Sequence, residues 1–381
     1  MVKKSIVFFT ENLYGGGVER IQQTILKHFD YKLYRVTLIS NRKEQMDLSL
    51  YPEEIHNNYR WVFESVSESD SLLIQFLKKV VNKLKLFVYY HFSPTFFYRL
   101  FIRERYDVGI AFIEGYSTRL LSGAPSSTKK IAWVHIELEN YHWSKVAFRD
   151  FEEELSCYKQ MDRVVCVSET VKDQFQRLFH KEATVMYNPI DTETIIRLSK
   201  DIPEMPQKSH EYRLIALGSL TKRKGFDRLI RAVYSLLCLH YSIELFILGK
   251  GEEEDHLLKL IKDLGLEAYV FLLGYKENPY CYMKNSDIYI CSSFAEGYNT
   301  AITEAMVLGL PVVSTLCSGV LEQLGDSQYG IVTSNTEEGL RIGIESMLNQ
   351  DAINHFSEMS ASRGKHYSLE LKMKEFYKLL L

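Results

Sequence analysis

A basic tripeptide beside a predicted strand is the first candidate for a functional site in this sequence. Lys222, Arg223 and Lys224 follow the apolar run 213–217 and precede a helical pattern, so they lie just past a strand's carboxyl end. Open α/β sheets bind ligands in the crevice outside the carboxyl ends of their strands. A lysine there offers a point charge for a diphosphate. A short basic run is more often a solvated surface, and that alternative stays open here.

Two glutamates follow a second predicted strand further along the chain. Glu296 lies in the loop after the strand 287–292, and Asn299 and Thr300 begin a helix whose first backbone N–H groups can hold phosphate oxygens. Glu304 comes eight residues after Glu296, so the two carboxylates can accept hydrogen bonds from different hydroxyls of one sugar nucleotide. The competing interpretation makes Glu296 a partner of the helix dipole and puts Glu304 on a solvated face.

A glycine loop follows the first predicted strand. Gly15, Gly16 and Gly17 precede a helix, and glycines there let the backbone turn tightly beside a helix N-terminus that favours anions. They do not fit G-x-G-x-x-G, so the nicotinamide fingerprint is missing. An ordinary strand-to-helix turn explains this loop equally well.

The elements that must position these residues form an α/β pattern. Short β-branched and aromatic runs alternate with helical patterns along the chain, and two of them, 130–135 and 163–168, are apolar enough for strands buried on both faces of a parallel sheet. The other predicted strands are 5–10, 34–40, 107–112, 184–188, 213–217, 244–248, 270–273, 287–292, 311–315 and 330–333.

The alternation of predicted strands and helices is interrupted once, by a charged segment with two prolines, and this segment divides the chain into two parts. We therefore expect an N-terminal domain over 1–190, a linker over 191–211 and a C-terminal domain over 212–362. A last helix falls within 363–381, and packing back onto the N-terminal domain is one arrangement that the sequence allows.

Length, charge and apolar runs exclude several classes of protein. The 381 residues suffice for two domains at ~100–200 residues each. A net charge of −3 argues against a strongly basic nucleic-acid binder, so we expect no nucleic-acid partner. The N-terminal apolar run is too short for a signal peptide, and no run reaches the ~18 residues of a membrane span, so we expect a cytoplasmic location. The one unusual number is 13% aromatic residues.

One stretch departs from this balanced charge. Residues 71–105 contain seven lysines and arginines against one acid, Glu104, together with nine aromatic residues. Apolar residues recur at helical spacing between Leu73 and Val88. A basic amphipathic helix with aromatic anchors suits an anionic membrane surface, and residues 72–105 are the candidate for peripheral attachment. A helix that packs on the core with a solvated basic face is the alternative.

At this point the sequence resembles a known family. The segments "GSLTKRKGFDRLI", "LFILGKGEEEDHL" and "SSFAEGYNTAITEAMVLGLPVVST" are similar to retaining glycosyltransferases of family 4, and so are "GGGVERI", "KKIAWVHIE" and "VMYNPID" in the first half. The match is strongest from Leu214 to Thr333, where Glu296 and Glu304 form an E-x7-E pattern. The resemblance implies a GT-B fold, in which two Rossmann-like domains face each other and the C-terminal one holds a nucleotide-sugar donor.

The resemblance also implies roles for single residues. Lys224 would contact the donor diphosphate, Glu304 the nucleotide ribose, and Glu296 and His135 would lie beside the transferred sugar. Many members carry arginine where this chain has Ser219, and this departure bears on the affinity for the donor. Further donor contacts are implied for Gly16, Gly17, Ser219, Arg223, Gly249, Asn299 and Thr300.

The expected activity follows from these roles. We expect a retaining, metal-independent transfer of a hexose or N-acetylhexosamine from a nucleotide sugar, UDP-linked rather than GDP-linked, to a glycan or lipid-linked acceptor in cell-surface polysaccharide or glycoprotein glycan synthesis. The donor is a substrate, so no cofactor is expected, and the chain has no D-x-D motif. Two alternatives remain: a non-catalytic partner subunit, and a nucleotide-sugar epimerase on the same fold.

Overall fold

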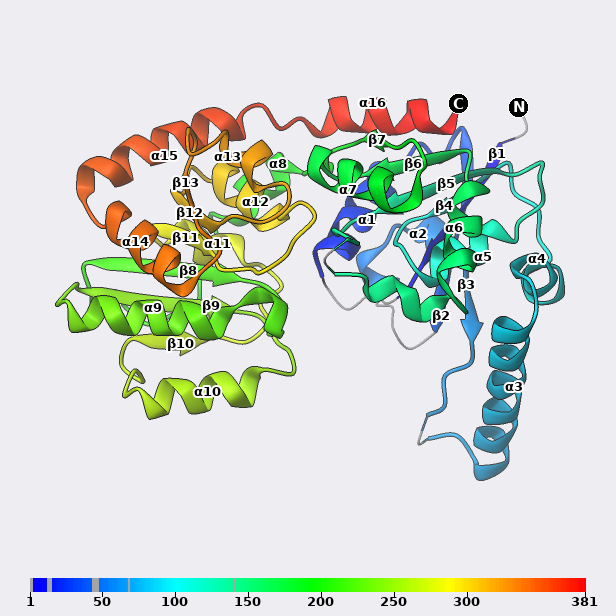
Figure 1. The fold of residues 1–381 in the computed structure, drawn as a ribbon, viewed down its shortest axis with the longest axis horizontal. Helices are drawn as coiled ribbons and strands as arrows, with labels where there is room; N and C mark the ends of the chain where they lie inside the picture. Colours follow the sequence, from blue (N-terminus) through cyan, green and yellow to red (C-terminus); the bar gives the residue numbers. More distant parts are fainter. Residues whose placement is uncertain (1–2, 12–15, 43–47, 68, 140) are drawn as a thin grey trace. The chain divides into compact units, whose positions relative to one another are not determined.

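Two compact units make up the chain in the computed structural model, which describes residues 3–11, 16–42, 48–67, 69–139 and 141–381. Unit 1 comprises Met1–Tyr187 and Met373–Leu381, and unit 2 comprises Asn188–Lys372. Each unit is an α/β domain with its own parallel sheet (Figure 1).

The sheet of unit 1 has seven parallel strands in the order β3-β2-β1-β4-β5-β6-β7. The central strands are buried on both faces, which explains why their sequences are mostly apolar. The strands are β1 (Lys4–Thr10), β2 (Tyr34–Arg42), β3 (Tyr59–Phe63), β4 (Val108–Ala111), β5 (Lys129–Val134), β6 (Arg163–Cys166) and β7 (Thr184–Val185). The edge strand β3 was not predicted from the sequence.

Helices connect these strands. The helices of unit 1 are α1 (Gly17–Lys27), α2 (Glu53–His56), α3 (Leu72–His91), α4 (Pro94–Phe97), α5 (Tyr116–Ser122), α6 (Phe151–Lys159) and α7 (Glu169–Phe179), with short 3-10 or π turns at Leu48–Leu50, Tyr98–Ile102 and Trp143–Ala147. Serine or aspartate caps the N-termini of α3, α6 and α7 and accepts a hydrogen bond from the first turn.

The end of the chain completes the core of unit 1. Helix α16 (Leu369–Leu380) contributes Phe376, which is fully buried. Its ring centroid lies 6.3 Å from Phe8, 5.8 Å from Phe29 and 6.1 Å from Trp133. The aromatic excess of the composition is therefore concentrated partly in this cluster, to which residues from both ends of the chain contribute.

The sheet of unit 2 has six parallel strands in the order β10-β9-β8-β11-β12-β13. They are β8 (Tyr212–Leu217), β9 (Ile243–Leu248), β10 (Val270–Leu272), β11 (Ile288–Cys291), β12 (Val312–Thr315) and β13 (Ile331–Thr333). Strand order reverses between β8 and β11, and such a switch point is where doubly wound sheets bind ligands. Both units therefore have the Rossmann-like architecture that the sequence predicts.

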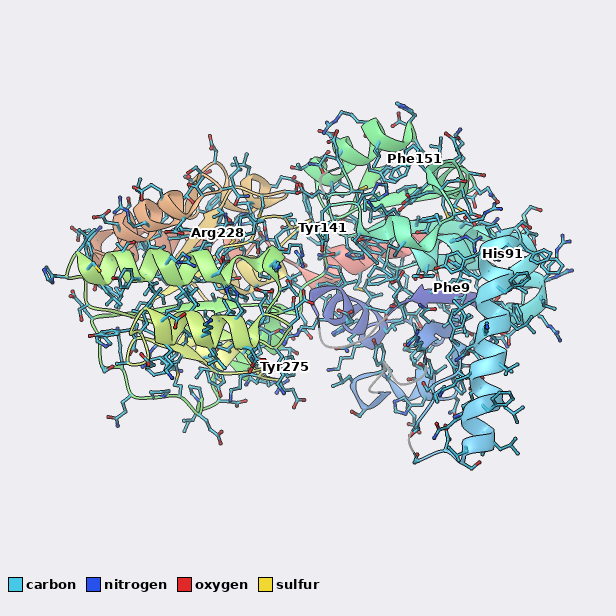
Figure 2. The ribbon with its side chains drawn as sticks, turned by 60° about the horizontal axis from the view of Figure 1, so that its bottom comes forward. Phe9, His91, Tyr141, Phe151, Arg228 and Tyr275 are labelled. Carbon is cyan, nitrogen blue, oxygen red and sulfur yellow. The ribbon has the colours of Figure 1, made fainter. Side chains whose placement is uncertain are left out.

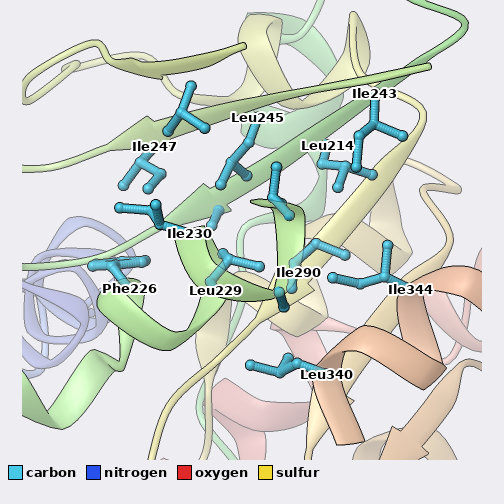
Figure 3. Close-up of a cluster of buried hydrophobic side chains, with 14 of the residues drawn as sticks. Leu214, Phe226, Leu229, Ile230, Ile243, Leu245, Ile247, Ile290, Leu340 and Ile344 are labelled. Carbon is cyan, nitrogen blue, oxygen red and sulfur yellow. The ribbon is translucent and has the colours of Figure 1, made fainter. Parts of the chain in front are cut away.

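Helices of unit 2 pack on this sheet around one hydrophobic core. Helix α9 (Phe226–Cys238) directs Phe226, Leu229 and Ile230 onto β8 and β9, and α14 (Glu337–Met347) closes the same core (Figure 3). Apolar residues three and four apart produce this buried stripe. The other helices of unit 2 are α10 (Glu254–Asp263), α11 (Tyr280–Lys284), α12 (Thr300–Val307), α13 (Val320–Leu324) and α15 (Gln350–Gly364).

The segment 191–211, expected as a linker, begins with a helix and lies within unit 2. Asp191 caps α8 (Thr192–Leu198) by accepting a hydrogen bond from the Thr194 N–H at 3.0 Å. The Asn278 side chain then donates to the Leu198 carbonyl at 2.9 Å, which fixes the helix to unit 2. The charged sequence concealed this helix because only Ile195 in it is buried.

Candidate active site

The candidate site residues that follow β8 and β11 lie close together at the carboxyl edge of the sheet of unit 2. Lys222–Lys224 form a 3-10 turn after β8, and Glu296 lies in the loop that follows β11. The Phe294 N–H donates to the Arg223 carbonyl at 2.8 Å and the Ser292 hydroxyl to the Lys224 carbonyl at 2.8 Å. One backbone hydrogen bond and one from a serine hydroxyl thus connect the two loops at the switch point of the sheet.

Three side chains hold the Glu296 carboxylate. Lys224 Nζ lies 2.5 Å from Oε1 and Arg223 3.0 Å from Oε2, while the Ser293 hydroxyl donates to Oε1 at 2.6 Å. Two cations and one carboxylate leave this cluster with one net positive charge. Lys222 and Ser219 are exposed, so the basic tripeptide is a solvated surface only at its first residue.

Electrostatics keep Glu296 ionised. Burial by itself would raise the pKa of this carboxyl group, but the charges of Lys224 and Arg223 outweigh burial and lower the pKa to about 2. Glu296 is therefore a carboxylate at any physiological pH. It can accept hydrogen bonds and stabilise positive charge, but it cannot serve as a general acid.

Two glycines allow the backbone to pack closely around this edge. A Cβ on Gly249 would lie 1.8 Å from the Gly218 carbonyl oxygen, so no side chain fits between the ends of β8 and β9. Gly225 has a φ of +61°, and a Cβ there would lie 2.4 Å from the Ser292 carbonyl oxygen. Gly225 lets the chain turn from the basic tripeptide directly into α9.

The N-terminus of α12 and its glutamate lie in the same unit. Asn299 is the N-cap, and its side chain accepts from the Ala301 N–H at 3.0 Å, while Thr300 is the first helical residue. Glu304 is buried and accepts a hydrogen bond from the Tyr280 hydroxyl at 3.2 Å. The interpretation of Glu304 as a residue on a solvated face is therefore wrong.

Arg228 is a supporting residue that the sequence analysis did not single out. It projects from α9 (Figure 2), is buried, and donates two hydrogen bonds to the Ser292 carbonyl at 2.9 and 2.5 Å. Its guanidinium also donates to the Asn335 carbonyl at 3.1 Å and lies 3.7 Å from the centroid of the Phe294 ring. An arginine on the buried stripe of an amphipathic helix was the available signal.

In unit 1 the structure places His135 directly after β5, in a buried position. Neither ring nitrogen has a hydrogen-bond partner among the described residues. Burial lowers the pKa of His135 to about 3, with a small opposing effect from the Phe112 backbone, so the imidazole is neutral at pH 7. A buried polar ring of this kind is suited to hydrogen-bond a ligand.

Glu114, which the sequence analysis missed, holds the His135 backbone. One carboxylate oxygen accepts from the His135 N–H at 3.0 Å and the other from the Trp143 indole at 3.0 Å. The residue is buried, and burial raises the pKa of its carboxyl group. It follows the short strand β4, whose apolar sequence gave no sign of a functional carboxylate.

The glycine loop is described only in part. Gly15 lies outside the described residues, Gly16 is the N-cap of α1 and Gly17 is its first residue. The Glu19 carboxylate turns back toward this N-terminus, and an oxygen lies 2.4 Å from where a Gly16 Cβ would be. An anionic ligand at Gly16 and Gly17 would have to displace this carboxylate, and their contact with the donor stays a prediction.

A cavity opens at the carboxyl ends of β1, β2 and β3. It has a volume of about 350 Å³, and the residues that line it include Glu11, Asn41, Arg42, Phe63 and Tyr116. Burial raises the pKa of Glu11 to about 8, although the Tyr116 N–H opposes this, and Asn41 Oδ1 is buried without a partner among the described residues. Amide, carboxyl, guanidinium and aromatic groups in one cavity match the hydroxyls and apolar faces of a sugar.

Comparison with known proteins agrees with this geometry. Residues 199–365 match the family described as glycosyl transferases group 1, and residues 15–194 match glycosyltransferase family 4. Together with these matches, the two Rossmann-like units identify the chain as a glycosyltransferase of the GT-B fold. The two matches together extend over most of the chain, and the protein belongs to glycosyltransferase family 4.

Similar sequences occur among bacterial enzymes. The N-acetylgalactosamine-N,N'-diacetylbacillosaminyl-diphospho-undecaprenol 4-alpha-N-acetylgalactosaminyltransferase of Campylobacter jejuni is 31% identical over 204 residues, 53% of this chain and 54% of that one. The lipopolysaccharide core biosynthesis glycosyltransferase LpsE of Rhizobium meliloti is 27% identical over 206 residues, 54% of this chain and 59% of that one. The matched region thus spans little more than half the length of either relative.

Solved structures share the fold. The HepE structure from Anabaena in complex with UDP and glucose aligns with a TM-score of 0.73 and 18% identity over 99% of both chains. The pneumococcal O-GlcNAc transferase GtfA in complex with UDP and GlcNAc aligns with a TM-score of 0.70 and 12% identity, over 100% of this chain and 99% of that one.

Proposed function

We propose that this protein is a retaining glycosyltransferase that moves a hexose or N-acetylhexosamine from a UDP-sugar to a glycan or lipid-linked acceptor in bacterial polysaccharide or glycoconjugate synthesis. The observation that carries the proposal is the cluster of Lys224, Arg223 and Glu296 at the carboxyl edge of unit 2, with a net positive charge. The UDP-bound HepE structure and the diphospho-undecaprenol acceptor named for the Campylobacter relative support the choice of donor and acceptor.

The proposed chemistry begins with departure of the diphosphate. Cleavage of the glycosyl–phosphate bond puts negative charge on the leaving group and positive charge on the sugar. Lys224 and Arg223 stabilise the leaving diphosphate, and the first N–H groups of α12 at Thr300 add to this. These groups can carry the leaving-group charge without a metal, so turnover is expected to persist with a chelator present.

The carboxylates and His135 act on the sugar and nucleoside. Glu296 stays ionised, so it accepts hydrogen bonds from the transferred sugar and favours the oxocarbenium-like transition state. Glu304, already hydrogen-bonded by Tyr280, is proposed to hold the ribose hydroxyls. His135 is neutral and offers a ring N–H to a sugar hydroxyl. Unit 1 receives the acceptor, whose sugar occupies the cavity of Glu11 and Asn41.

A donor screen tests the first half of the proposal. UDP-sugars and GDP-sugars are added singly, and thermal unfolding is recorded; a ligand present at 100 times its Kd stabilises the folded state by ~2.7 kcal/mol. Stabilisation by a UDP-sugar but not by its GDP counterpart is expected. Stabilisation by neither would contradict the proposed donor class.

Product analysis tests the second half. With the stabilising donor and a lipid-linked or oligosaccharide acceptor, proton NMR of the product gives the anomeric configuration, which is expected to match that of the donor. Conversion of the donor sugar without any acceptor would favour the epimerase alternative. Donor binding without turnover on any acceptor would favour a non-catalytic subunit. Inversion of configuration, or loss of turnover with chelator, would refute the mechanism.

We also propose that the enzyme is cytoplasmic and works at the inner face of the membrane, which fits a lipid-linked acceptor.

A further inference from the structure

Two cysteines lie at the same edge of the sheet as Lys224 and Glu296, and the proposed mechanism uses neither of them. Cys291 is the last residue of β11 and is only 2% exposed. Cys317 follows the end of β12 by two residues and is half-buried. Because β11 and β12 are parallel neighbours, with Cys291 opposite Ser314, both cysteines lie at the carboxyl edge of the sheet.

The two thiol groups interact directly. The Cys317 and Cys291 side chains form a hydrogen bond, and the Asn299 side chain donates another to Cys291 Sγ at 3.1 Å. The hydrogen bond from Cys317 lowers the pKa of Cys291; burial and the charge of Glu296 oppose this, and the charge of Lys224 supports it. The same hydrogen bond raises the pKa of Cys317. When the pair loses a proton, the negative charge therefore lies on Cys291.

Other buried cysteines of the chain have a different environment. Cys157 and Cys166 in unit 1 are also buried, and burial raises the pKa of both thiols. A cysteine of that kind is an inert, small apolar residue. Cys291 differs because a second thiol and a lysine charge favour its thiolate, and the thiolate is the form that reacts.

The pair is connected to the candidate active site through two contacts. The Asn299 side chain that donates to Cys291 also caps the N-terminus of α12. The loop after β12 packs on the loop of Glu296, since a Cβ on Gly319 would lie 2.6 Å from the Gly297 carbonyl oxygen. A disulfide brings two sulfur atoms to about 2 Å, closer than a hydrogen bond does. Its formation would therefore shift the ends of β11 and β12 and disturb the cap of α12.

We propose that Cys291 and Cys317 form a reversible disulfide that slows glycosyl transfer when hydrogen peroxide oxidises the protein. The Cys291 thiolate attacks the peroxide, the O–O bond breaks, and a sulfenic acid forms. The Cys317 sulfur then attacks that sulfur, the S–O bond breaks, and the S–S bond forms. The two thiols together lose two electrons and two protons, and the peroxide takes up both and leaves as two molecules of water.

A dithiol reductant reverses the reaction by thiol–disulfide exchange and is itself oxidised to a disulfide. In a reducing compartment a disulfide of this kind is transient, which suits a switch better than a structural bond. Only the effect on transfer rests on the proposed function, because formation of the disulfide is a property of the two cysteines alone.

Peptide mass tests the disulfide without reference to catalysis. No lysine or arginine occurs between Lys284 and Arg341, so trypsin releases both cysteines in one peptide, residues 285–341. The full chain is treated with hydrogen peroxide or, separately, with diamide, which converts paired thiols to disulfides without adding oxygen. Remaining thiols are then blocked with iodoacetamide in denaturant. We expect the oxidised peptide to be lighter by two hydrogen atoms and unblocked, and dithiothreitol to restore a peptide that is blocked at both cysteines.

Matched variants connect the disulfide to activity. Cys317→Ala removes one half of the pair at a half-buried position, and Cys238→Ala, at the exposed cysteine of α9, is the control. After diamide, the wild type and Cys238→Ala should transfer sugar ~10-fold more slowly or worse and recover with dithiothreitol, because misplacement on the order of 1 Å can cost ~100-fold in rate. Cys317→Ala should keep its rate through the same treatment.

These measurements can support or overturn each part of the proposal. A linked peptide that dithiothreitol reverses, with a loss of rate that Cys317→Ala prevents, supports the switch. A wild-type peptide that is still blocked at both cysteines after either oxidant overturns the disulfide. A linked peptide with an unchanged transfer rate overturns the regulation. Absence of transfer by the reduced protein counts against the proposed function and not against the disulfide, which the peptide mass decides alone.

Discussion

Lys224 and Glu296 form an ion pair, so removal of either residue deprives the other charge of this partner. Each charge is largely buried, and each has the other as a close partner at 2.5 Å. Under the proposed mechanism Lys224 also faces the leaving diphosphate, so it contributes to the transition state as well as to the ion pair. Lys222, two residues away on the same turn, is exposed and serves as the matched control for Lys224.

Lys224→Ala is expected to lower kcat/KM by ~100-fold or more, the scale of losing one preorganised charge at the reacting group. Lys222→Ala should leave kcat/KM nearly unchanged. Steady-state kinetics with the donor identified by the thermal screen measure both. Near-normal activity of Lys224→Ala would show that this residue does not stabilise the leaving group.

His135 gives a prediction that depends on pH. The folded protein binds a proton on this ring only near pH 3, whereas the unfolded chain does so near 6.5, so stability is lost as the pH falls through 6.5. Between pH 7.5 and pH 5 the wild type should lose about 2 kcal/mol that His135→Phe does not lose. Denaturant unfolding at both pH values measures the difference.

An exposed histidine provides the control. His355→Phe, on α15, should leave the unfolding free energy at pH 7.5 close to the wild-type value, because an exposed side chain makes little contribution to packing. Equal pH dependence of His135→Phe and the wild type would mean that the imidazole is solvated in the folded protein.

The sequence located the chemistry of the site more readily than its interactions. Lys224, Glu296 and Glu304 stand out because their residue types and their positions after apolar strands can be read directly from the sequence. The contact between Lys224 and Glu296 joins residues 72 positions apart, and only the folded sheet brings them together. Glu114 was missed because its partners, the His135 backbone and the Trp143 indole, are brought to it only by the fold, and Arg228 left only the sign of an arginine on the buried stripe of a helix.

At the scale of elements, the loop after β11 depends on α9. Arg228 projects from that helix and donates hydrogen bonds to the carbonyls of Ser292 and Asn335. The same loop carries Glu296. The position of the carboxylate is therefore set partly by an arginine that touches neither it nor the proposed substrate.

Arg228→Leu is expected to destabilise unit 2 by about 3 kcal/mol, because two carbonyl groups lose a charged donor in a buried place. Arg228→Lys should restore only part of this, since an ammonium cannot reproduce the fork of the guanidinium. Chemical unfolding followed by circular dichroism measures both variants. The wild-type unfolding free energy in Arg228→Leu would show that the arginine is dispensable to the loop.

Strands were predicted well where burial on both faces makes their sequences apolar. The parallel strands β5 and β6 are apolar after their first one or two residues, because both faces of the sheet are buried there. The edge strand β3, "YRWVF", has an exposed arginine and no continuous apolar run, and it was missed. The pattern of α3 showed which residues share a face, but pattern alone cannot tell whether that face turns toward the protein or away from it.

At the scale of the whole molecule, unit 1 is built from two separate parts of the chain. Phe376 of α16 is fully buried among Phe8, Phe29 and Trp133. All three tryptophans, Trp61, Trp133 and Trp143, lie in unit 1, so tryptophan fluorescence, excited selectively over tyrosine, comes from this unit.

Phe376→Ala is expected to cost about 4 kcal/mol, the usual loss for an aromatic residue removed from a packed core. The loss should appear as a lower midpoint of the tryptophan-fluorescence transition. Phe246→Ala, at a fully buried position of β9 in unit 2, is the control and should leave that transition in place. An unchanged fluorescence midpoint in Phe376→Ala would mean that α16 adds little to unit 1.

The contribution of Phe376 also bears on how the protein is made. A ribosome synthesises Met1–Tyr187 first and then all of Asn188–Lys372 before it reaches Met373–Leu381. During that interval the aromatic cluster around Phe8 and Trp133 has an open position that only the later segment fills. Unit 2, by contrast, is continuous in the chain and is synthesised whole before that segment. A nascent chain interrupted before Met373 would therefore contain all of unit 2 but only an incomplete unit 1, which is a natural target for chaperones and proteases.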